Sequence, residues 1–109
     1  MDLIKVSGSS RTSAVAGAIA GVVRDYQRAE VQAIGAQAVN QAVKTLALAR
    51  RYLQRDSIDI VIIPEFVEIT IDEKIRTAIR FTVETRQSVA QEPSGEETPA
   101  ESASPPEGQ

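Results

Sequence analysis

The chain lacks histidine, cysteine and tryptophan altogether. Imidazole and thiolate are the groups that most often serve proteins as general base, nucleophile or zinc ligand. Serine–histidine and cysteine–histidine hydrolysis, disulfide scaffolds and the usual zinc sites are therefore excluded. We expect no enzymatic activity, no cofactor and no metal site. The lack of cysteine also fits a reducing compartment.

Aromatic residues are scarce, at 4% of 109 residues, so the core has to be built from Val, Ile, Leu and Ala. Long apolar runs are missing too, since the longest one, Ala14–Val23, has ten residues. A membrane-spanning helix needs about 20. The chain opens with Met1-Asp2 rather than with a basic segment, so we expect no secretory signal. These features predict a soluble, cytoplasmic, single-domain protein.

The net charge of −3 is divided unevenly along the chain. All 12 Lys and Arg fall within residues 1–86 together with 10 Asp and Glu, a net charge of +2. Residues 87–109 hold five Glu, no base and four of the five prolines. Such a segment cannot bury enough apolar surface to offset its ordering entropy. We predict a folded domain over residues 1–86 and a disordered acidic tail over residues 87–109.

The first part of the chain predicts a strand and a helix. Leu3–Val6 is a short apolar strand that ends at the turn-forming Ser7–Ser10. A helix is predicted over Ala14–Arg28, with the side chain of Ser10, Thr12 or Ser13 capping its free N–H groups.

That helix contains two glycines four residues apart, Gly17 and Gly21. Glycine costs about 1 kcal/mol relative to alanine inside a helix. Small residues at this spacing let another backbone approach closely. We favour tight packing on a sheet as the reason, over a ligand or partner surface.

A second strand and helix follow. Glu30–Ile34 alternates polar and apolar residues, which is typical of a strand with one solvated face. Gly35 is interpreted as the tight turn into the next helix. From Ala36 to Leu53 the apolar residues recur with helical spacing.

The last third predicts strands only. Ile58–Ile63 is apolar and β-branched, which favours an interior strand, and Pro64 indicates a bulge or a change of partner. Alternating residues on either side of the turn at Asp72–Lys74 predict a long hairpin. The order βαβαββ is an α+β fold, a two-layer sandwich with two helices on a four-stranded mixed sheet. Right-handed crossovers place both helices on one face, leaving the other face open to solvent or a partner.

The second helix carries the strongest charge signal. Between Ala36 and Arg55 there are four bases and no acid. Helical spacing puts five polar residues on one edge: Gln37, Gln41, Lys44, Arg51 and Arg55. Such an edge attracts a phosphate backbone, and amides beside it bond sugar or base edges. The slightly favoured alternative is that the arginines only neutralise the negative end of the helix.

The sequence offers three other candidate sites. The strand-to-helix turn at Gly35 has free N–H groups for an anion, but it lacks the motif of a dinucleotide or P-loop site. Arg76 and Arg80 share a strand face and can clamp a phosphate; we favour their pairing with acids of the neighbouring strand. Glu65 and Glu68 are expected on a solvated face, where acid–base catalysis is disfavoured.

Several segments resemble the stage V sporulation protein S family. They are Leu3–Ser7, Ser13–Val22, Ile34–Ala36, Val39–Lys44, Ile62–Phe66 and Arg76–Ile79. The resemblance covers about residues 2–86. It implies a small bacterial protein of sporulation and septation, with a fold like that of the Alba chromatin proteins, βαβαββ dimers that bind DNA or RNA.

Carried over by position, the basic turn of Alba proteins corresponds to Ser9–Arg11. The glycine-rich turn before their second helix corresponds to Gly35–Gln37, followed by Asn40 and Lys44, and their hairpin arm to Ile71–Arg80. This sequence offers fewer cations at these places, which favours weak, RNA-directed or partner-assisted binding. We therefore expect a homodimeric nucleic-acid-binding regulator with contacts from Arg11, Asn40, Gln41, Lys44, Arg51, Arg76 and Arg80. The alternative is a protein-interaction adaptor of the sporulation or division machinery.

Overall fold

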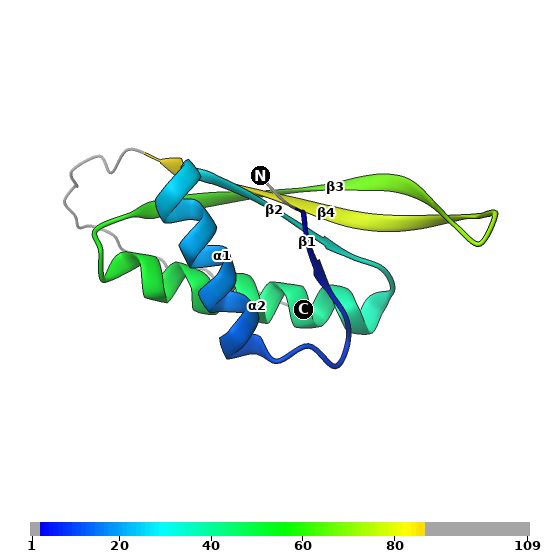
Figure 1. Cartoon of the computed structure of the whole chain (residues 1–109), viewed down its shortest axis with the longest axis horizontal. Helices are drawn as coiled ribbons and strands as arrows, with labels where there is room; N and C mark the ends of the chain where they lie inside the picture. Colours follow the sequence, from blue (N-terminus) through cyan, green and yellow to red (C-terminus); the bar gives the residue numbers. More distant parts are fainter. Residues whose placement is uncertain (1–2, 87–109) are drawn as a thin grey trace, which may run out of the picture.

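The computed structural model describes residues 3–86 (Figure 1). The predicted acidic tail, residues 87–109, lies outside the described residues. The elements are β1 Leu3–Val6, α1 Thr12–Tyr26, β2 Arg28–Ala33, α2 Ala36–Gln54, β3 Asp59–Ile71 and β4 Lys74–Arg86. The predicted order βαβαββ is confirmed. α1 ends two residues before its predicted end, because Gln27 turns the chain with a left-handed φ of 66°.

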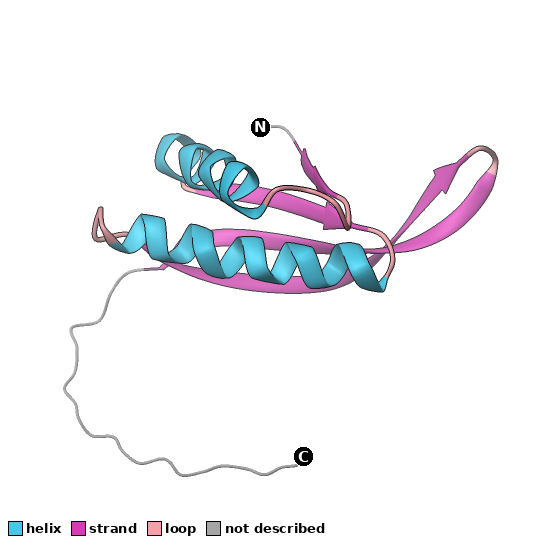
Figure 2. Cartoon of the chain, turned by 90° about the horizontal axis from the view of Figure 1, so that it is seen from below, coloured by secondary structure: helices cyan, strands magenta, loops and turns pink. Residues whose placement is uncertain are grey.

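The four strands form one mixed sheet in the order β1-β2-β4-β3. β1 runs parallel to β2, and β4 runs antiparallel to both β2 and β3. Both helices cover the same face of this sheet, as predicted (Figure 2). No helix within residues 3–86 is long and apolar enough to cross a membrane.

The core lies between the helices and the sheet and is built from small and β-branched residues. Ile19, Val31, Leu53 and Val83 are fully buried there, at 0% exposure. Burying a side chain of this size stabilises the fold by about 1.5–3 kcal/mol. Alanines complete the helix faces toward the core and let the layers approach closely: Ala16 and Ala20 on α1, Ala42 and Ala49 on α2.

The packing role predicted for Gly17 and Gly21 is wrong. A Cβ at either position would meet no atom within 4 Å apart from the backbone of its own helix. The side of α1 that packs against the core carries Ala16, Ile19, Ala20 and Val23, which are all buried. The helical period therefore places the two glycines away from the sheet.

The position predicted for β3 is also wrong, because β3 lies at the edge of the described sheet. Its apolar composition has two separate causes. Ile60 and Ile62 face the core, whereas Val61 and Ile63 alternate onto the sheet face that no helix of this chain covers. A strand of this composition at an edge leaves Ile63 50% exposed.

Pro64 makes no bulge and no change of partner. The antiparallel register of β3 and β4 runs unbroken from Asp59 opposite Arg86 to Ile71 opposite Lys74. Proline lacks the N–H group of a ladder bond, and an edge strand tolerates that loss.

The β3–β4 hairpin extends past the end of β2, whose last register pair is Ala33 with Ile79 (Figure 1). Asp72 and Glu73 form its two-residue turn, with φ values of 51° and 65°. A two-residue turn in which both φ values are positive matches the right-handed twist of the two strands that it joins. The predicted turn is confirmed, and the residues beyond β2 form a two-stranded arm.

Candidate nucleic-acid interface

The loop from Ser7 to Arg11 is fixed against α2. The Gln41 Nε2 amide donates a hydrogen bond to the carbonyl oxygen of Ser10, with 2.6 Å between nitrogen and oxygen. A Cβ on Gly8 would lie only 3.2 Å from the Cβ of Gln37 in the first turn of α2. The structure thus brings Arg11 to the same end of the molecule as the first turns of α2.

The predicted side-chain cap of α1 is wrong. The N-cap is Arg11, in an extended conformation with φ −83° and ψ 118°, and its side chain makes no capping hydrogen bond. The Ser10 hydroxyl instead accepts a hydrogen bond from the backbone N–H of Ser7, at 2.9 Å. The Arg11 side chain is exposed and makes no ion pair with any described residue.

An open cleft of about 570 Å³ lies where β1 and β2 end and α2 begins. Its polar lining includes Lys5, Ser7, Gln32 and Gln37. Gly35, the N-cap of α2, has a φ of 90°, so the predicted turn role of this glycine is confirmed. No side chain caps α2, and its first N–H groups are therefore available to an anion.

Lys44 and Arg51 are exposed and lie together on α2, where they line a shallow hollow with Ala47 and Leu48. Asn40 is exposed one turn before Lys44. Among the residues described, ion pairs engage only four arginines: Arg24, Arg28, Arg50 and Arg86. Lys44 and Arg51 take part in none of these pairs. We name Arg11, Asn40, Lys44 and Arg51 the α2 edge.

Arg50 of α2 has an ion-pair partner, and Arg55, which directly follows α2, has an aromatic contact but no ion pair among the described residues. Arg50 pairs with Asp59 of β3, with 3.8 Å between nitrogen and oxygen. The Arg55 guanidinium lies over the Tyr52 ring, 5.7 Å from its centroid. Of Arg50, Arg51 and Arg55, Arg51 is the one that makes neither an ion pair nor a cation–π contact with a described residue, and we therefore assign it to the α2 edge.

Arg76 and Arg80 lie on the opposite side of the sheet. Phe81, next to Arg80 in β4, packs against the helices, so strand alternation turns Arg80 to the uncovered face. Arg80 Nη2 donates to Gln32 Oε1 at 2.8 Å, while its Nε is buried without a partner. The favoured pairing with acids of β3 is wrong: Glu65 stands opposite Arg80 in the register but makes no ion pair with it.

The seven predicted contact residues therefore fall into two groups. The structure brings Arg11, Asn40, Gln41, Lys44 and Arg51 to the helical side, and it places Arg76 and Arg80 on the uncovered sheet face. Gln41 uses its amide nitrogen to hold the loop and is a positioning residue. Because the two groups lie on opposite sides of the sheet, a straight ligand bound to one side of a single chain cannot contact both groups.

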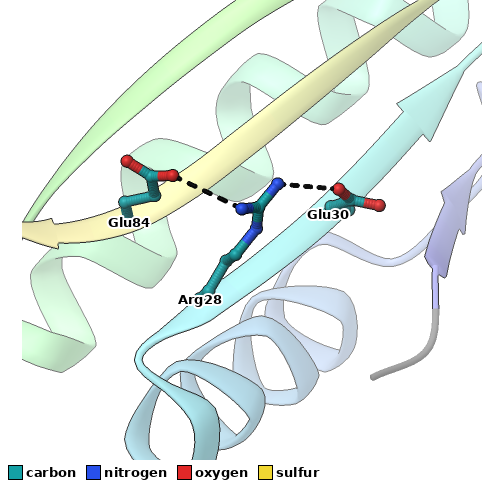
Figure 3. A network of polar contacts seen from close by, with 3 residues as sticks. All are labelled: Arg28, Glu30 and Glu84. Carbon is teal, nitrogen blue, oxygen red and sulfur yellow. Dashed lines mark hydrogen bonds and ion pairs between the residues drawn. The ribbon is translucent and has the colours of Figure 1, made fainter.

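The uncovered sheet face also carries a charge network that sequence reasoning missed. Arg28 of β2 donates to Glu30 at 3.0 Å and pairs with Glu84 of β4 at 3.6 Å (Figure 3). Arg28 and Glu84 are register partners, and only the pairing of β2 with β4 reveals this. The network neutralises Arg28, so this part of the face offers no unpaired cation.

Glu65 and Glu68 are both exposed, as expected. They are three residues apart in a strand, so their side chains point to opposite faces. Within residues 3–86, no cluster of three potential metal-ligating side chains is present. Glu65 and Glu68 are therefore not held together as a pair for acid–base work.

The fold is Alba-like. Among solved structures, Alba from Thermoplasma volcanium is similar, with a TM-score of 0.53 and 16% identity over 76% of this chain and 99% of that one. At this identity the likeness shows the fold. The Stage V sporulation protein S (SpoVS) family matches residues 2–86, and the chain belongs to this family. It is a small sporulation-related protein.

Proposed function

We propose that this protein is a non-enzymatic, cytoplasmic regulator of sporulation or septation that binds nucleic acid through the α2 edge. The observation that carries the proposal is the state of Lys44 and Arg51. Both are exposed, neither is paired with a described residue, and the segment from Ala36 to Arg55 contains no acid. A phosphate backbone is attracted to such a surface without competition from a carboxylate of the same helix.

Neighbouring groups supply the remaining contacts of this proposal. Arg11 adds a third cation from the loop that Gln41 holds. Asn40 offers an amide to sugar or base edges. Three phosphate contacts correspond to a slope of roughly −3 in log affinity against log salt for duplex DNA. We therefore expect modest, strongly salt-dependent binding rather than coating of DNA.

Fluorescence anisotropy of the full chain tests this proposal, with labelled single-stranded RNA and duplex DNA at about 50 to 200 mM salt. The double variant Lys44→Gln/Arg51→Gln should weaken binding roughly tenfold and reduce the salt slope by about 2. The matched control is Arg24→Gln/Arg28→Gln, which removes the same charge from ion-paired arginines and should change affinity less than about threefold. Equal losses in both variants would contradict the proposal. So would an absence of binding at low salt, which would favour the protein-interaction adaptor.

We also propose that the protein is a homodimer that pairs through β3. This edge strand has the composition of an interior strand, with Ile63 50% and Phe66 79% exposed. Ile63 and Phe66 lie on opposite faces of β3, so a second copy of β3 would add a neighbouring strand beside each of them, and it would supply partners for the free backbone groups of the edge. Two copies would also present two α2 edges to one nucleic acid.

Sedimentation equilibrium of the full chain tests the dimer. The wild-type chain should sediment with twice the chain mass, and Phe66→Asp should give the monomer mass. Tyr26→Asp is the control, because Tyr26 on α1 is similarly exposed, at 62%, and lies away from β3. A monomeric wild-type chain at about 100 μM would contradict this part of the proposal, since a stable dimer has a lower Kd.

A further inference from the structure

Two segments of this chain carry opposite charge. The segment from Ala36 to Arg55 has four bases and no acid. Residues 87–109 have no base and contain five glutamates: Glu92, Glu96, Glu97, Glu101 and Glu107. The charges of +4 and −5 are nearly matched.

The described chain ends close to the basic segment. Arg86, the last residue of β4, holds Asp59 through its Nη2 at 2.8 Å and its Nε at 2.9 Å. The other oxygen of Asp59 pairs with Arg50 of α2 at 3.8 Å. Figure 1 shows the end of β4, the start of β3 and the last turn of α2 at the same end of the molecule. Arg86, the last described residue, therefore lies beside the last turns of α2.

Chain length permits contact along the whole basic segment. Lys44 and Arg55 are 11 residues apart, which is about 16 Å along a helix. Glu92 follows Arg86 by six residues, a span of up to about 20 Å, and the later glutamates reach further. A segment tethered this closely has an effective concentration on the order of millimolar.

We propose that residues 87–109 dock on the basic surface of α2 in the same chain, with their glutamates facing Lys44, Arg51 and Arg55. None of these three makes an ion pair with a described residue. The competition between tail and nucleic acid rests on the function proposed above, because carboxylates and phosphates would then occupy the same cations. The contact itself does not depend on that function.

The contact is tested on the full chain without nucleic acid. The chain has no cysteine, so Ser102→Cys carries one nitroxide label at a single site. Paramagnetic relaxation should weaken the amide signals of α2 between Lys44 and Arg55. About 0.5 M salt, which shortens the Debye length to a few ångströms, should restore them, and so should Glu→Gln at all five tail positions.

Equal relaxation in the acidic and the neutralised chains would overturn the contact. A mixed sample tests whether the contact occurs within one chain. In this sample one set of chains carries the nitroxide but no ¹⁵N, and the other set carries ¹⁵N but no nitroxide. Full relaxation in that sample would overturn the intrachain assignment.

The competition is tested by anisotropy with the same RNA and DNA probes. A tail that covers the surface about nine-tenths of the time lowers apparent affinity about tenfold. The five Glu→Gln substitutions should therefore tighten binding about tenfold. The control is neutralisation of four acids of the β3–β4 hairpin, Glu65, Glu68, Asp72 and Glu73, which changes net charge without touching the tail. An equal gain in the control would overturn the competition. If no form binds either probe, the proposed function fails, while the relaxation experiment still decides the contact.

Discussion

The side-chain amide of Gln41 donates a hydrogen bond to the backbone carbonyl of Ser10 across 2.6 Å, which ties the second turn of α2 to the loop before α1. The same loop rests on the first turn of α2, where Gly8 approaches Gln37. One cation of the α2 edge, Arg11, thus depends for its place on a residue of another element. The site is built by packing between two distant parts of the chain.

Gln41→Ala should loosen this loop. Loss of one part-buried hydrogen bond lowers the free energy of unfolding by about 1 kcal/mol. The amides from Ser7 to Arg11 should exchange with solvent faster, which hydrogen exchange measures residue by residue. The control is Asn40→Ala, since the side chain of Asn40 makes no hydrogen bond with another described residue. Unchanged exchange in Gln41→Ala would show that the bond does not hold the loop.

Gly35→Ala should destabilise the fold through the backbone alone. Gly35 has a φ of 90° and a ψ of 156°, and a Cβ there would meet no atom within 4 Å. A side chain in this conformation costs about 1–3 kcal/mol. Gly17→Ala, in a helix interior and equally free of contacts, should instead stabilise by about 0.5–1 kcal/mol. Urea unfolding compares the two, and changes of the same sign would refute this reading of the glycines.

Glu73→Gly should stabilise the hairpin turn. Glu73 has a φ of 65°, and an ordinary side chain in the left-handed region costs about 1 kcal/mol. Glycine at this position of a two-residue hairpin turn removes that cost. The free energy of unfolding should rise by up to about 1 kcal/mol, whereas Thr70→Gly in β3 should lower it by about 0.5–1 kcal/mol. A loss of stability in Glu73→Gly would contradict the turn geometry.

Asp59 should make stability depend on pH in the acid range. The hydrogen bond from Arg86 lowers the pKa of Asp59 despite partial burial, and the charges of Arg86 and Arg50 add to the effect. A lowered pKa means that ionised Asp59 stabilises the fold above the ordinary aspartate value of about 3.9. That contribution is lost as the pH falls below this value, because the unfolded state then binds a proton that the folded state, with its lower pKa, does not yet bind.

Asp59→Asn should therefore lower the free energy of unfolding at neutral pH, and the difference from wild type should shrink by about pH 3. Urea unfolding at both pH values measures this. Asp25→Asn is the matched control, since Asp25 makes no ion pair with a described residue. A difference that stays constant from neutral to acid pH would show that the carboxyl charge of Asp59 is not its source.

Local sequence patterns predicted the element order, the common face of the two helices, and the turns at Gly35 and Asp72-Glu73. Each of these depends on neighbours in the chain or on the handedness of a crossover. The edge position of β3 was missed because composition reports which faces of a strand are apolar and not which strand lies beside it. Gly17 and Gly21 were misplaced because spacing alone does not show which side of a helix packs.

The candidate site was predicted less completely. Lys44 and Arg51 were predicted because the excess of basic residues and the helical spacing that places them on one side can both be read within a single segment of the sequence. The partner of Arg80 was missed, since Gln32 is 48 residues away and becomes its neighbour only through the register of β2 with β4. Gln41 was predicted as a contact, and its bond to Ser10 depends on how the loop packs. Interactions between distant segments require the assembled fold.

The central claim is that nucleic acid binds the α2 edge. Amide chemical-shift mapping of the full ¹⁵N-labelled chain, titrated with a short single-stranded RNA and separately with a DNA duplex, tests it most directly. Binding at the α2 edge should give shifts concentrated at Arg11, Asn40, Lys44 and Arg51, and these shifts should diminish as salt is raised. Shifts confined to the uncovered sheet face around Arg76 and Arg80, or no shifts with either probe at low salt, would contradict it.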